Sequence, residues 1–314
     1  MLKANVTNAI SALKPLKLSE NELEHRLTTC EVVAFDLDGT LFDDKKRISL
    51  SNRFAIEQIA HSGMPVLVAT GRVASVLPNA VQSLPGLFAI VGANGSSIMK
   101  VTSDRGLKLV HERGIMPAEG AALIEQLIEK FDVYIDVADH GLLYTSAGML
   151  ARIAAREFEI SSQQVNFVCQ TRLERPDFVR FVSRLSGPLE RINVYTRNHD
   201  ERKQVRQWLE EKKGLSFANS LGTNIEINAK GISKWNGICQ CAEAAGYDWH
   251  HCMVIGDGTN DISMIEAASV GVAMDNAPAA VKACADVVAP CNVDDGVAYV
   301  LAALLDMKRA SRRQ

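Results

Sequence analysis

The sequence lacks the features that mark membrane-spanning, disulfide-bonded and nucleic-acid-binding proteins. No stretch approaches the roughly 20 consecutive apolar residues that a membrane-spanning helix needs. The seven cysteines are odd in number and no two are spaced as C-x-x-C, which argues against a disulfide framework or a zinc ribbon and fits a reducing cytoplasm. The formal net charge is only −3, so there is no global basic field to hold nucleic acid. The N-terminal stretch MLKANVTNAISALKPLKL has no continuous apolar segment, and we expect no signal peptide there.

Three common catalytic or cofactor-binding motifs are also missing. The sequence contains no G-x-x-x-x-G-K-[ST] and no G-x-S-x-G, which disfavours P-loop triphosphate hydrolysis and ester hydrolysis by a serine triad. The loop GDGTND at 256–261 begins like a dinucleotide-binding fingerprint, but Asp261 stands where the third glycine belongs. Dinucleotide binding is therefore disfavoured as well.

The most informative stretch that is present is EVVAFDLDGTLF, residues 31–42. Its apolar run 32–35 is typical of a buried parallel strand. Asp36 and Asp38 follow directly, at the carboxyl end where open α/β sheets bind their ligands. Two carboxylates this close repel each other unless a divalent cation neutralises them, and Mg²⁺ prefers such oxygen ligands. The alternative interpretation is an ordinary solvated turn, since Asp-Gly also marks turns.

The alternation of apolar runs predicts an α/β sheet domain that is interrupted along the chain. At 314 residues the chain exceeds the usual size of a single core, so two domains are expected. Buried strands alternate with helices up to about residue 91, a hairpin follows, and the alternation resumes at about residue 232. The predicted strands of this domain are 32–35, 65–69, 87–91, 97–101, 107–112, 252–255, 270–273 and 286–288, and the helices are 49–61, 74–84, 232–245, 261–268, 278–284 and 294–307.

A different pattern, with strands in pairs, occupies the middle of the chain and predicts a separate α+β module. Its predicted helices are 118–131, 149–158, 176–185 and 200–213, and its strands are 133–137, 142–145, 191–196, 215–219 and 224–227. We therefore predict a core of residues 31–116 and 222–314 with an inserted domain at 117–221. Residues 1–30 are expected to form an extension with one short helix and a linker.

Several predicted strand ends carry groups able to bind a phosphorylated ligand. The groups at these ends are Asp36 with Asp38, Thr70, Asn94, and Asp257 with Asp261. Because the carboxyl ends of parallel strands share one edge of a sheet, a metal site built from Asp36, Asp38 and Asp257 is geometrically reasonable. The Thr70 hydroxyl, loop N–H groups and the Lys234 ammonium could hold phosphoryl oxygens, although each of these signals is weak by itself.

The cluster His250, His251 and Cys252 has the letters of a metal site. It lies immediately before an apolar strand, and we assign it a structural role.

Taken in order, four motifs resemble those of the haloacid dehalogenase (HAD) superfamily of phosphatases: DLDGTLF at 36–42, TGR at 70–72, GISK at 231–234 and GDGTND at 256–261. ANGS at 93–96, GVAMDNA at 271–277 and DDGVA at 294–298 resemble further landmarks of its Cof-type branch (subclass IIB). The resemblance covers about residues 31–305. It implies a doubly wound, Rossmann-like parallel sheet, the HAD fold, with an inserted α+β cap domain of the C2 type.

The resemblance also implies a reaction, the hydrolysis of a phosphomonoester. Asp36 would attack phosphorus and form an aspartyl-phosphate. Asp38 would protonate the leaving alcohol and then take a proton from the attacking water. The carboxylate and the phosphate dianion repel each other, so Mg²⁺ and Lys234 would be needed to neutralise them.

The remaining site residues are implied by the same resemblance. The phosphoryl group would be held by Thr70, Gly71, Lys234, Asn260 and the backbone N–H of Leu37. The Mg²⁺ ligands would be Asp36, Asp257 and the backbone carbonyl of Asp38. Asp261 would support the site from behind these ligands and hold Lys234.

We therefore expect a Mg²⁺-dependent cytoplasmic phosphatase of small phosphorylated metabolites such as sugar phosphates, a monomer or weak homo-oligomer that binds neither nucleic acid nor membrane. One alternative is a phosphotransferase, in which a second alcohol replaces water. Another is a catalytically idle regulator that binds phospho-metabolites, against which the intact Asp38 argues. Polar and aromatic residues of the cap could select the substrate, and the sequence favours none among Tyr134, Asp136, His140, Tyr144, Arg180 and Tyr195.

Overall fold

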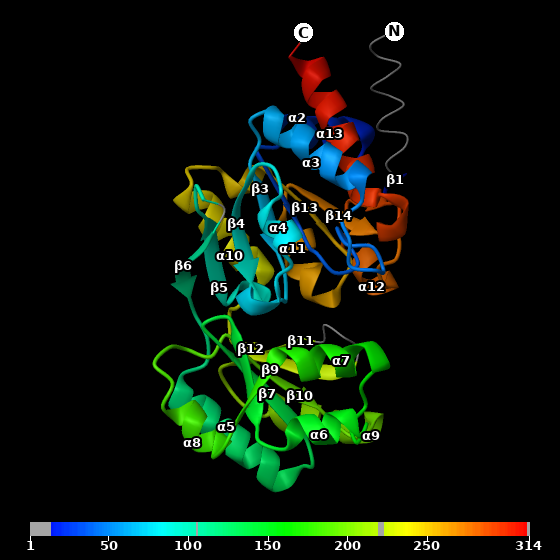
Figure 1. Ribbon diagram of the computed structural model, residues 1–314. Coiled ribbons are helices and arrows are strands. Elements are labelled where there is room, and N and C mark those ends of the chain that lie inside the picture. The colour runs from blue at the N-terminus through cyan, green and yellow to red at the C-terminus, as the bar shows by residue number, and fades with distance from the viewer. Residues whose placement is uncertain (1–13, 105, 219–222, 313–314) are drawn as a thin grey trace. The chain divides into compact units, whose positions relative to one another are not determined.

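The computed structural model describes residues 14–104, 106–218 and 223–312, and within them the chain forms two compact units (Figure 1). The first unit runs to Thr70 and includes Pro78–Val110 and the chain from Ser233 onward. The second unit consists of Gly71–Leu77 and His111–Ile232. Each unit is built around its own sheet.

The sheet of the first unit has nine strands in the order β1-β15-β14-β13-β2-β3-β4-β5-β6. The six strands from β15 to β4 are parallel, whereas β1 and β5 are antiparallel to their neighbours. The strand bounds are β1 Lys14–Pro15, β2 Val32–Phe35, β3 Val66–Ala69, β4 Leu87–Gly92, β5 Ser97–Val101, β6 Leu107–Glu112, β13 Cys252–Gly256, β14 Val270–Met274 and β15 Val287–Ala289.

The strand order explains where this sheet can bind a ligand. From β2 the chain proceeds to β3 and β4 on one side, while β13, β14 and β15 extend on the other. The order therefore reverses between β2 and β13, and in open α/β sheets ligands bind outside the carboxyl ends of the strands at such a reversal. All four side chains of β2 are buried, as expected for a central parallel strand.

Helices cover this sheet on both faces. Helices α10 and α11 pack against a core that includes Val32, Leu67 and Val254. Helix α13 contacts both α2 and α3, and Figure 1 shows the three together. The bounds are α2 Glu20–Thr29, α3 Leu50–His61, α4 Asn79–Gln82, α10 Lys234–Ala244, α11 Ile262–Ala267, α12 Ala279–Lys282 and α13 Gly296–Ser311, with short 3₁₀ turns η1 Ala74–Val76, η2 Ala93–Gly95, η3 Trp249–His251, η4 Thr259–Asp261 and η5 Asn292–Asp294.

The sheet of the second unit has six strands in the order β11-β12-β10-β7-β8-β9. All neighbours are antiparallel except β8 and β9. The bounds are β7 Tyr134–Asp139, β8 Leu142–Ser146, β9 Arg172–Arg175, β10 Arg191–Tyr195, β11 Leu215–Ala218 and β12 Asn224–Ala229, and the helices are α5 Pro117–Lys130, α6 Met149–Ala154, α7 Ser162–Thr171, α8 Phe178–Ser183 and α9 His199–Glu210.

Alternation along the strands gives this second sheet two different faces. Ile135 and Val137 join one apolar cluster with residues of α5, α8 and α9. Tyr134, on the opposite face, joins a smaller cluster with Ile153 and Phe158. The prediction of an α/β core with a parallel-rich sheet and an additional α+β sheet is confirmed.

The predicted helix at 74–84 is wrong. The segment instead forms the turn η1 and the short helix α4, with Pro78 between them. A proline disfavours the helical conformation of the residue before it, and Leu77 is accordingly extended, with ψ 124°.

Two elements of the second unit were not predicted, namely α7 and β9. Helix α7 begins with a capping box formed by Ser161 and Gln164, a signal that is readable in the sequence. Strand β9, with the letters RLER, has no apolar pattern and is defined by its pairing with β8.

The boundaries of the units differ from those expected. Strand β12 lies beyond residue 221 yet pairs with β10 in the second sheet, and the second unit extends to Ile232. The described part of the N-terminal extension belongs with the first unit, because β1 pairs with β15 and α2 contacts α13. Residues 1–13 and the expected limits at 219 and 221–222 lie outside the described residues.

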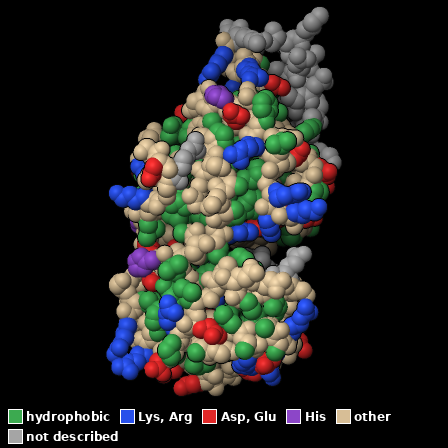
Figure 2. Space-filling model, in the orientation of Figure 1, with side chains coloured by type: hydrophobic (Ala, Val, Ile, Leu, Met, Phe, Trp, Pro, Cys, Tyr) green, Lys and Arg blue, Asp and Glu red, His purple; other side chains and the backbone are tan. Residues whose placement is uncertain are grey.

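The helices and the surface both agree with what the composition predicts. Among the described residues, no helix combines the length and the apolar character needed to cross a membrane. Figure 2 shows basic and acidic side chains both spread over the face that it draws.

Candidate active site

Asp36 lies at the carboxyl end of β2, next to the point where the strand order reverses. Its backbone N–H still donates to the Ile255 carbonyl of β13, at 3.0 Å, so the sheet fixes the start of the loop. The side chain is 7% exposed. A carboxylate buried to this degree needs a partner of opposite charge.

Lys234 supplies that charge. It is the first residue of α10 and is fully buried, and its Nζ lies 2.6 Å from Asp36 Oδ1 and 2.6 Å from Asp261 Oδ1. Burial alone would lower the pKa of Lys234, but the carboxylates of Asp261 and Asp36 outweigh burial and raise that pKa. Lys234 is therefore a cation at neutral pH, and both carboxylates are bound to it.

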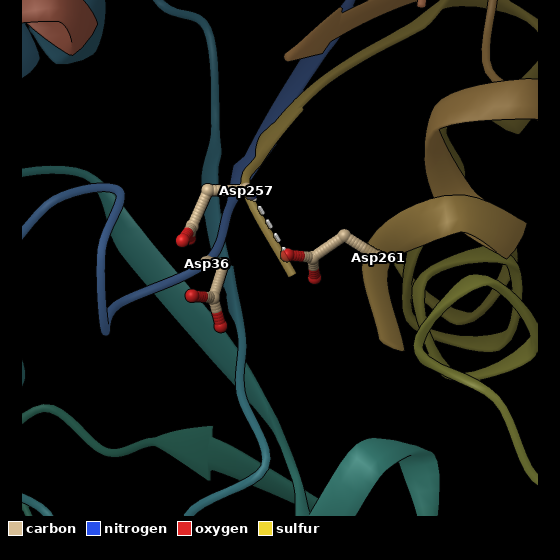
Figure 3. A group of neighbouring side chains, drawn as sticks. All are labelled: Asp36, Asp257 and Asp261. Atoms are coloured by element: carbon tan, nitrogen blue, oxygen red, sulfur yellow. Dashed lines mark hydrogen bonds between the residues drawn. The ribbon is translucent and has the colours of Figure 1, made fainter. Parts of the chain in front are cut away.

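Asp261 is occupied on both oxygens. While Oδ1 binds Lys234, Oδ2 accepts from the backbone N–H groups of Asp257 and Gly258, at 3.0 and 2.8 Å. Figure 3 shows the bond to Asp257 as a dashed line. The side chain thus holds the lysine and shapes the loop that follows β13.

Asp257 follows β13 and faces the loop after β2. Its Oδ1 accepts from the Thr40 hydroxyl at 2.8 Å, and its Oδ2 lies 3.4 Å from Asn276 Nδ2. Asn276 also donates to the Gly39 carbonyl at 2.8 Å, so it ties the two loops together. In Figure 3 the carboxylates of Asp36 and Asp257 lie close to each other.

The electrostatics of this group favour a bound cation. Ligand oxygens of Asp36, Asp257 and Asp261 lie within 4.8 Å of one another. Burial raises the pKa of Asp36 well above its usual value, and the neighbouring carboxylates raise it further against the effect of Lys234. Burial and the Asp261 carboxylate raise the pKa of Asp257 from 3.8 to about 6. A divalent cation between Asp36 and Asp257 would remove this cost, and hard oxygen donors suit Mg²⁺, so the residues present fit the metal.

Asp38 and Leu37 lie in the turn that follows Asp36. Leu37 is fully buried, and its carbonyl accepts from the Phe42 N–H at 2.8 Å, which closes the turn. The Asp38 carboxylate is partly exposed and lies 2.7 Å from Lys46 Nζ. Lys46 was not predicted as a site residue, and the run Asp43–Arg47 offers no motif that would have identified it.

Thr70 and Asn260 lie in the loops that follow β3 and β13 at the same sheet edge. Thr70 is 1% exposed and its N–H donates to the Val91 carbonyl at 2.8 Å, which extends the pairing of β3 with β4. Gly71 follows it directly. Asn260 lies in η4, and its Nδ2 donates to Asn94 Oδ1 at 3.0 Å.

Sequence reasoning missed the supporting residues Thr40 and Asn276. Both lie within runs that were quoted as landmarks, DLDGTLF and GVAMDNA, but Thr40 is 217 positions from Asp257 along the chain, and Asn276 is separated from Asp257 by η4, α11 and β14. Letters in a motif show that a residue belongs to the site and do not show what it touches.

The second unit contains a buried polar network around two of the expected cap candidates. Asp136 Oδ2 accepts from Arg172 Nε and Asn193 Nδ2, each at 3.2 Å, and Asp136 is fully buried. Asn224 extends the network through a bond to Asn193 at 2.9 Å. Tyr195 lies beside it, fully buried. These contacts are internal to the sheet.

The sequence matches the family described as haloacid dehalogenase-like hydrolase over residues 33–301. The chain belongs to this family. The 5-amino-6-(5-phospho-D-ribitylamino)uracil phosphatase YcsE of Bacillus subtilis is 30% identical over 273 residues, which are 86% of this chain and 94% of that protein. The pyridoxal phosphate phosphatase YbhA of Escherichia coli is 29% identical over 279 residues, which are 87% and 98% of the two chains.

A solved structure of a subclass IIB sugar phosphatase of the same superfamily superposes with a TM-score of 0.72 at 21% identity, covering 88% of this chain and 99% of that one. The fold predicted from the motifs is confirmed, as is membership of the HAD superfamily. As a member of this family with phosphatases as its relatives, the chain is a hydrolase of the class that acts on phosphoric monoesters.

Proposed function

We propose that this protein is a Mg²⁺-dependent phosphatase of small phosphorylated metabolites that works through an aspartyl-phosphate on Asp36. The observation that carries the proposal is the buried group Asp36, Lys234 and Asp261 beside Asp257. It combines a nucleophile, a fixed cation and a metal-binding carboxylate at the reversal point of a parallel sheet.

The ligands for the metal would be the carboxylates of Asp36 and Asp257 with the backbone carbonyl of Asp38. Asp261 is left out of this set because both of its oxygens already accept hydrogen bonds. When bound, Mg²⁺ would neutralise charge on the phosphoryl group and so lower the repulsion that Asp36 meets.

The chemical steps would be carried by the chain's own residues. A carboxylate oxygen of Asp36 attacks phosphorus, and the bond from phosphorus to the substrate oxygen breaks. Asp38, protonated at the start, gives its proton to that oxygen, so that an alcohol leaves. Asp38 then takes a proton from water, whose oxygen attacks the phosphorus of the aspartyl-phosphate. The bond from phosphorus to the Asp36 oxygen breaks, so that Asp36 is restored and inorganic phosphate leaves.

The phosphoryl group would be held by Thr70, Gly71, Lys234, Asn260 and the N–H of Leu37. Lys234 would balance the charge that develops on the phosphoryl oxygens while remaining bound to Asp261. Because Asp261 keeps it in place, the ammonium needs no reorganisation during the reaction.

For the substrate we propose the class of small phosphorylated metabolites. Two relatives are named phosphatases of a ribitylamino-uracil phosphate and of pyridoxal phosphate, both of them small phosphomonoesters.

The seven cysteines are all free in the structure, in keeping with the expected cytoplasmic location.

The test is phosphate release from a panel of sugar, nucleotide and vitamin phosphates, with the wild type and with Asp36→Asn. We expect EDTA to abolish release and Mg²⁺ to restore it. Asp36→Asn should keep the fold, because Asn is nearly isosteric, and lose turnover in every case. Turnover by Asp36→Asn, or full activity in metal-free buffer, would contradict the proposal, and transfer of phosphate to an added alcohol in preference to water would favour a phosphotransferase.

A further inference from the structure

The loop Ala93–Gly95 has an unusual backbone. Ala93, Asn94 and Gly95 have φ values of 47°, 59° and 107°, so three consecutive residues lie in the left-handed region. Residues other than glycine rarely adopt such angles, and they persist only where the surroundings impose them. Strain of this kind gathers at functional sites.

Asn94 connects two of the loops that meet at the sheet edge. Its backbone N–H donates to the Thr70 carbonyl at 3.0 Å, and its Oδ1 accepts from Asn260 Nδ2 at 3.0 Å. Asn94 as a whole is 5% exposed. One residue therefore contacts the end of β3 through its backbone and the loop after β13 through its side chain.

Gly95 brings the same loop against a third element. A Cβ on Gly95 would lie 2.2 Å from the Ser233 carbonyl oxygen, so only glycine permits this approach. Ser233 is the N-cap of α10, whose first residue is Lys234. The loop 93–95 thus bonds to two proposed phosphate ligands, Thr70 and Asn260, and contacts Ser233, the neighbour of a third, Lys234.

We propose that Asn94 is a positioning residue that orients Asn260, and with it this edge of the site, for the phosphoryl group. The inference rests on the proposed function. With one Nδ2 hydrogen directed at Asn94, the Asn260 amide plane is set, and its second N–H can donate to an anionic oxygen. Asn at position 94 combines a side-chain acceptor with tolerance of the left-handed conformation.

The test separates the side chain from the backbone. Asn94→Gly keeps the backbone angles free of strain but removes the acceptor. We expect the KM of the best substrate in the panel and the inhibition constant of inorganic phosphate each to rise about tenfold, with a smaller change in kcat. Tenfold is the low end of the losses typical when a residue that orients a ligand-binding side chain is removed. Arg156→Gly is the matched control, because Arg156 is an exposed residue with φ 58° far along the chain, and it should leave both constants unchanged.

A double-mutant cycle with Asn260→Ala tests whether Asn94 acts through Asn260. If Asn94 acts through Asn260, Asn94→Gly should add little to the loss caused by Asn260→Ala. Losses that multiply, or an Asn94→Gly protein with the phosphate inhibition constant of the wild type, would overturn the inference. Thermal melts check folding. Asn94→Ser, whose hydroxyl is too short to replace the amide, should give the same loss and serves if the glycine variant does not fold.

The two proposals fail in different ways. A wild type that hydrolyses no phosphomonoester and binds no inorganic phosphate in calorimetry contradicts the proposed function itself. An active wild type whose constants are insensitive to Asn94→Gly contradicts only the role of Asn94.

Discussion

Lys234 shows how buried charges are compensated in this protein. Lys234 and Asp261 are fully buried and Asp36 is 5% exposed. The Lys234 Nζ nevertheless lies 2.6 Å from a carboxylate oxygen of each aspartate, so no charge in the group is without a partner. Removing one member of such a group leaves the others buried without compensation, which costs more than the group contributes as a whole. The same arrangement that we propose for phosphate chemistry therefore also affects stability.

Lys234→Met should lower the free energy of unfolding by about 3 kcal/mol at pH 7 in EDTA, because two buried carboxylates lose their cation. Urea unfolding followed by circular dichroism measures this. Lys282→Met is the control: Lys282 pairs with Asp275 at 2.8 Å at the surface, and we expect a change below about 1 kcal/mol. Equal losses in the two variants would contradict the prediction, because they would mean that removing the cation from the buried carboxylates costs no more than breaking an ion pair at the surface.

Asp257 makes stability depend on pH when the metal is removed. Its pKa is about 6 in the folded protein against an ordinary value of 3.8, so the folded state binds this proton more tightly. The resulting stabilisation is fully present below pH 3.8 and is lost as pH rises through about 6. Asp257→Asn, neutral at every pH, has no such loss.

In EDTA, the free energy of unfolding of the wild type relative to Asp257→Asn should therefore fall by about 1 kcal/mol between pH 5 and pH 7.5. Urea titrations of both proteins across this range measure the difference. Mg²⁺ should restore the wild type at pH 7.5 and have little effect on the variant, since the cation favours the ionised carboxylate. A difference that stays constant with pH would refute the prediction.

At the scale of elements, the loop after β2 fits the loop after β13 with no room to spare. Gly39 has φ 84°, and a Cβ there would lie 2.2 Å from Asp257 Oδ2. The Thr40 hydroxyl, one position on, donates to the other oxygen of the same carboxylate. The sequence Asp-Gly-Thr at 38–40 therefore lets the two loops approach each other around Asp257, one of the proposed metal ligands.

Gly39→Ala should lower both stability and the apparent affinity for Mg²⁺, whereas Gly63→Ala should lower stability alone. Gly63 has nearly the same φ, 85°, but open space around its Cβ position, so this variant isolates the backbone cost of about 1–2 kcal/mol. Thermal melts and Mg²⁺ titrations of activity compare the two. An unchanged Mg²⁺ requirement in Gly39→Ala would show that the Asp257 carboxylate is free to shift.

At the scale of the whole molecule, the residues proposed for chemistry lie almost entirely in the first unit. Asp36, Asp38, Lys234 and Asp257 all belong to it, and the second unit has its own sheet and its own apolar clusters. We propose that the second unit is a domain that serves substrate choice rather than the chemical step.

Excising His111–Ile232 and bridging the gap with a short Gly/Ser linker tests this proposal. We expect a folded product that hydrolyses a small activated phosphate in the presence of Mg²⁺ but discriminates poorly among natural substrates, because water exclusion and positioning are lost. A cut at 117–221 would instead leave β12 without its partner strand β10. Circular dichroism and the substrate panel decide: an unfolded product contradicts the two-domain proposal, and unchanged preference contradicts the role in selection.

Much of this protein was determined by the sequence alone. Buried strands such as 32–35 are apolar on both faces, so their letters identify them, and the carboxylates that follow mark the sheet edge. Only the tertiary structure showed which side chains contact one another in the site. Thr40 and Asn276 contact Asp257, Asn94 bonds to Asn260, and Lys46 lies beside Asp38. Local propensity describes a residue's own backbone, whereas the contacts of Thr40, Asn276 and Asn94 join residues brought together only when β2, β4, β13 and β14 assemble into one sheet.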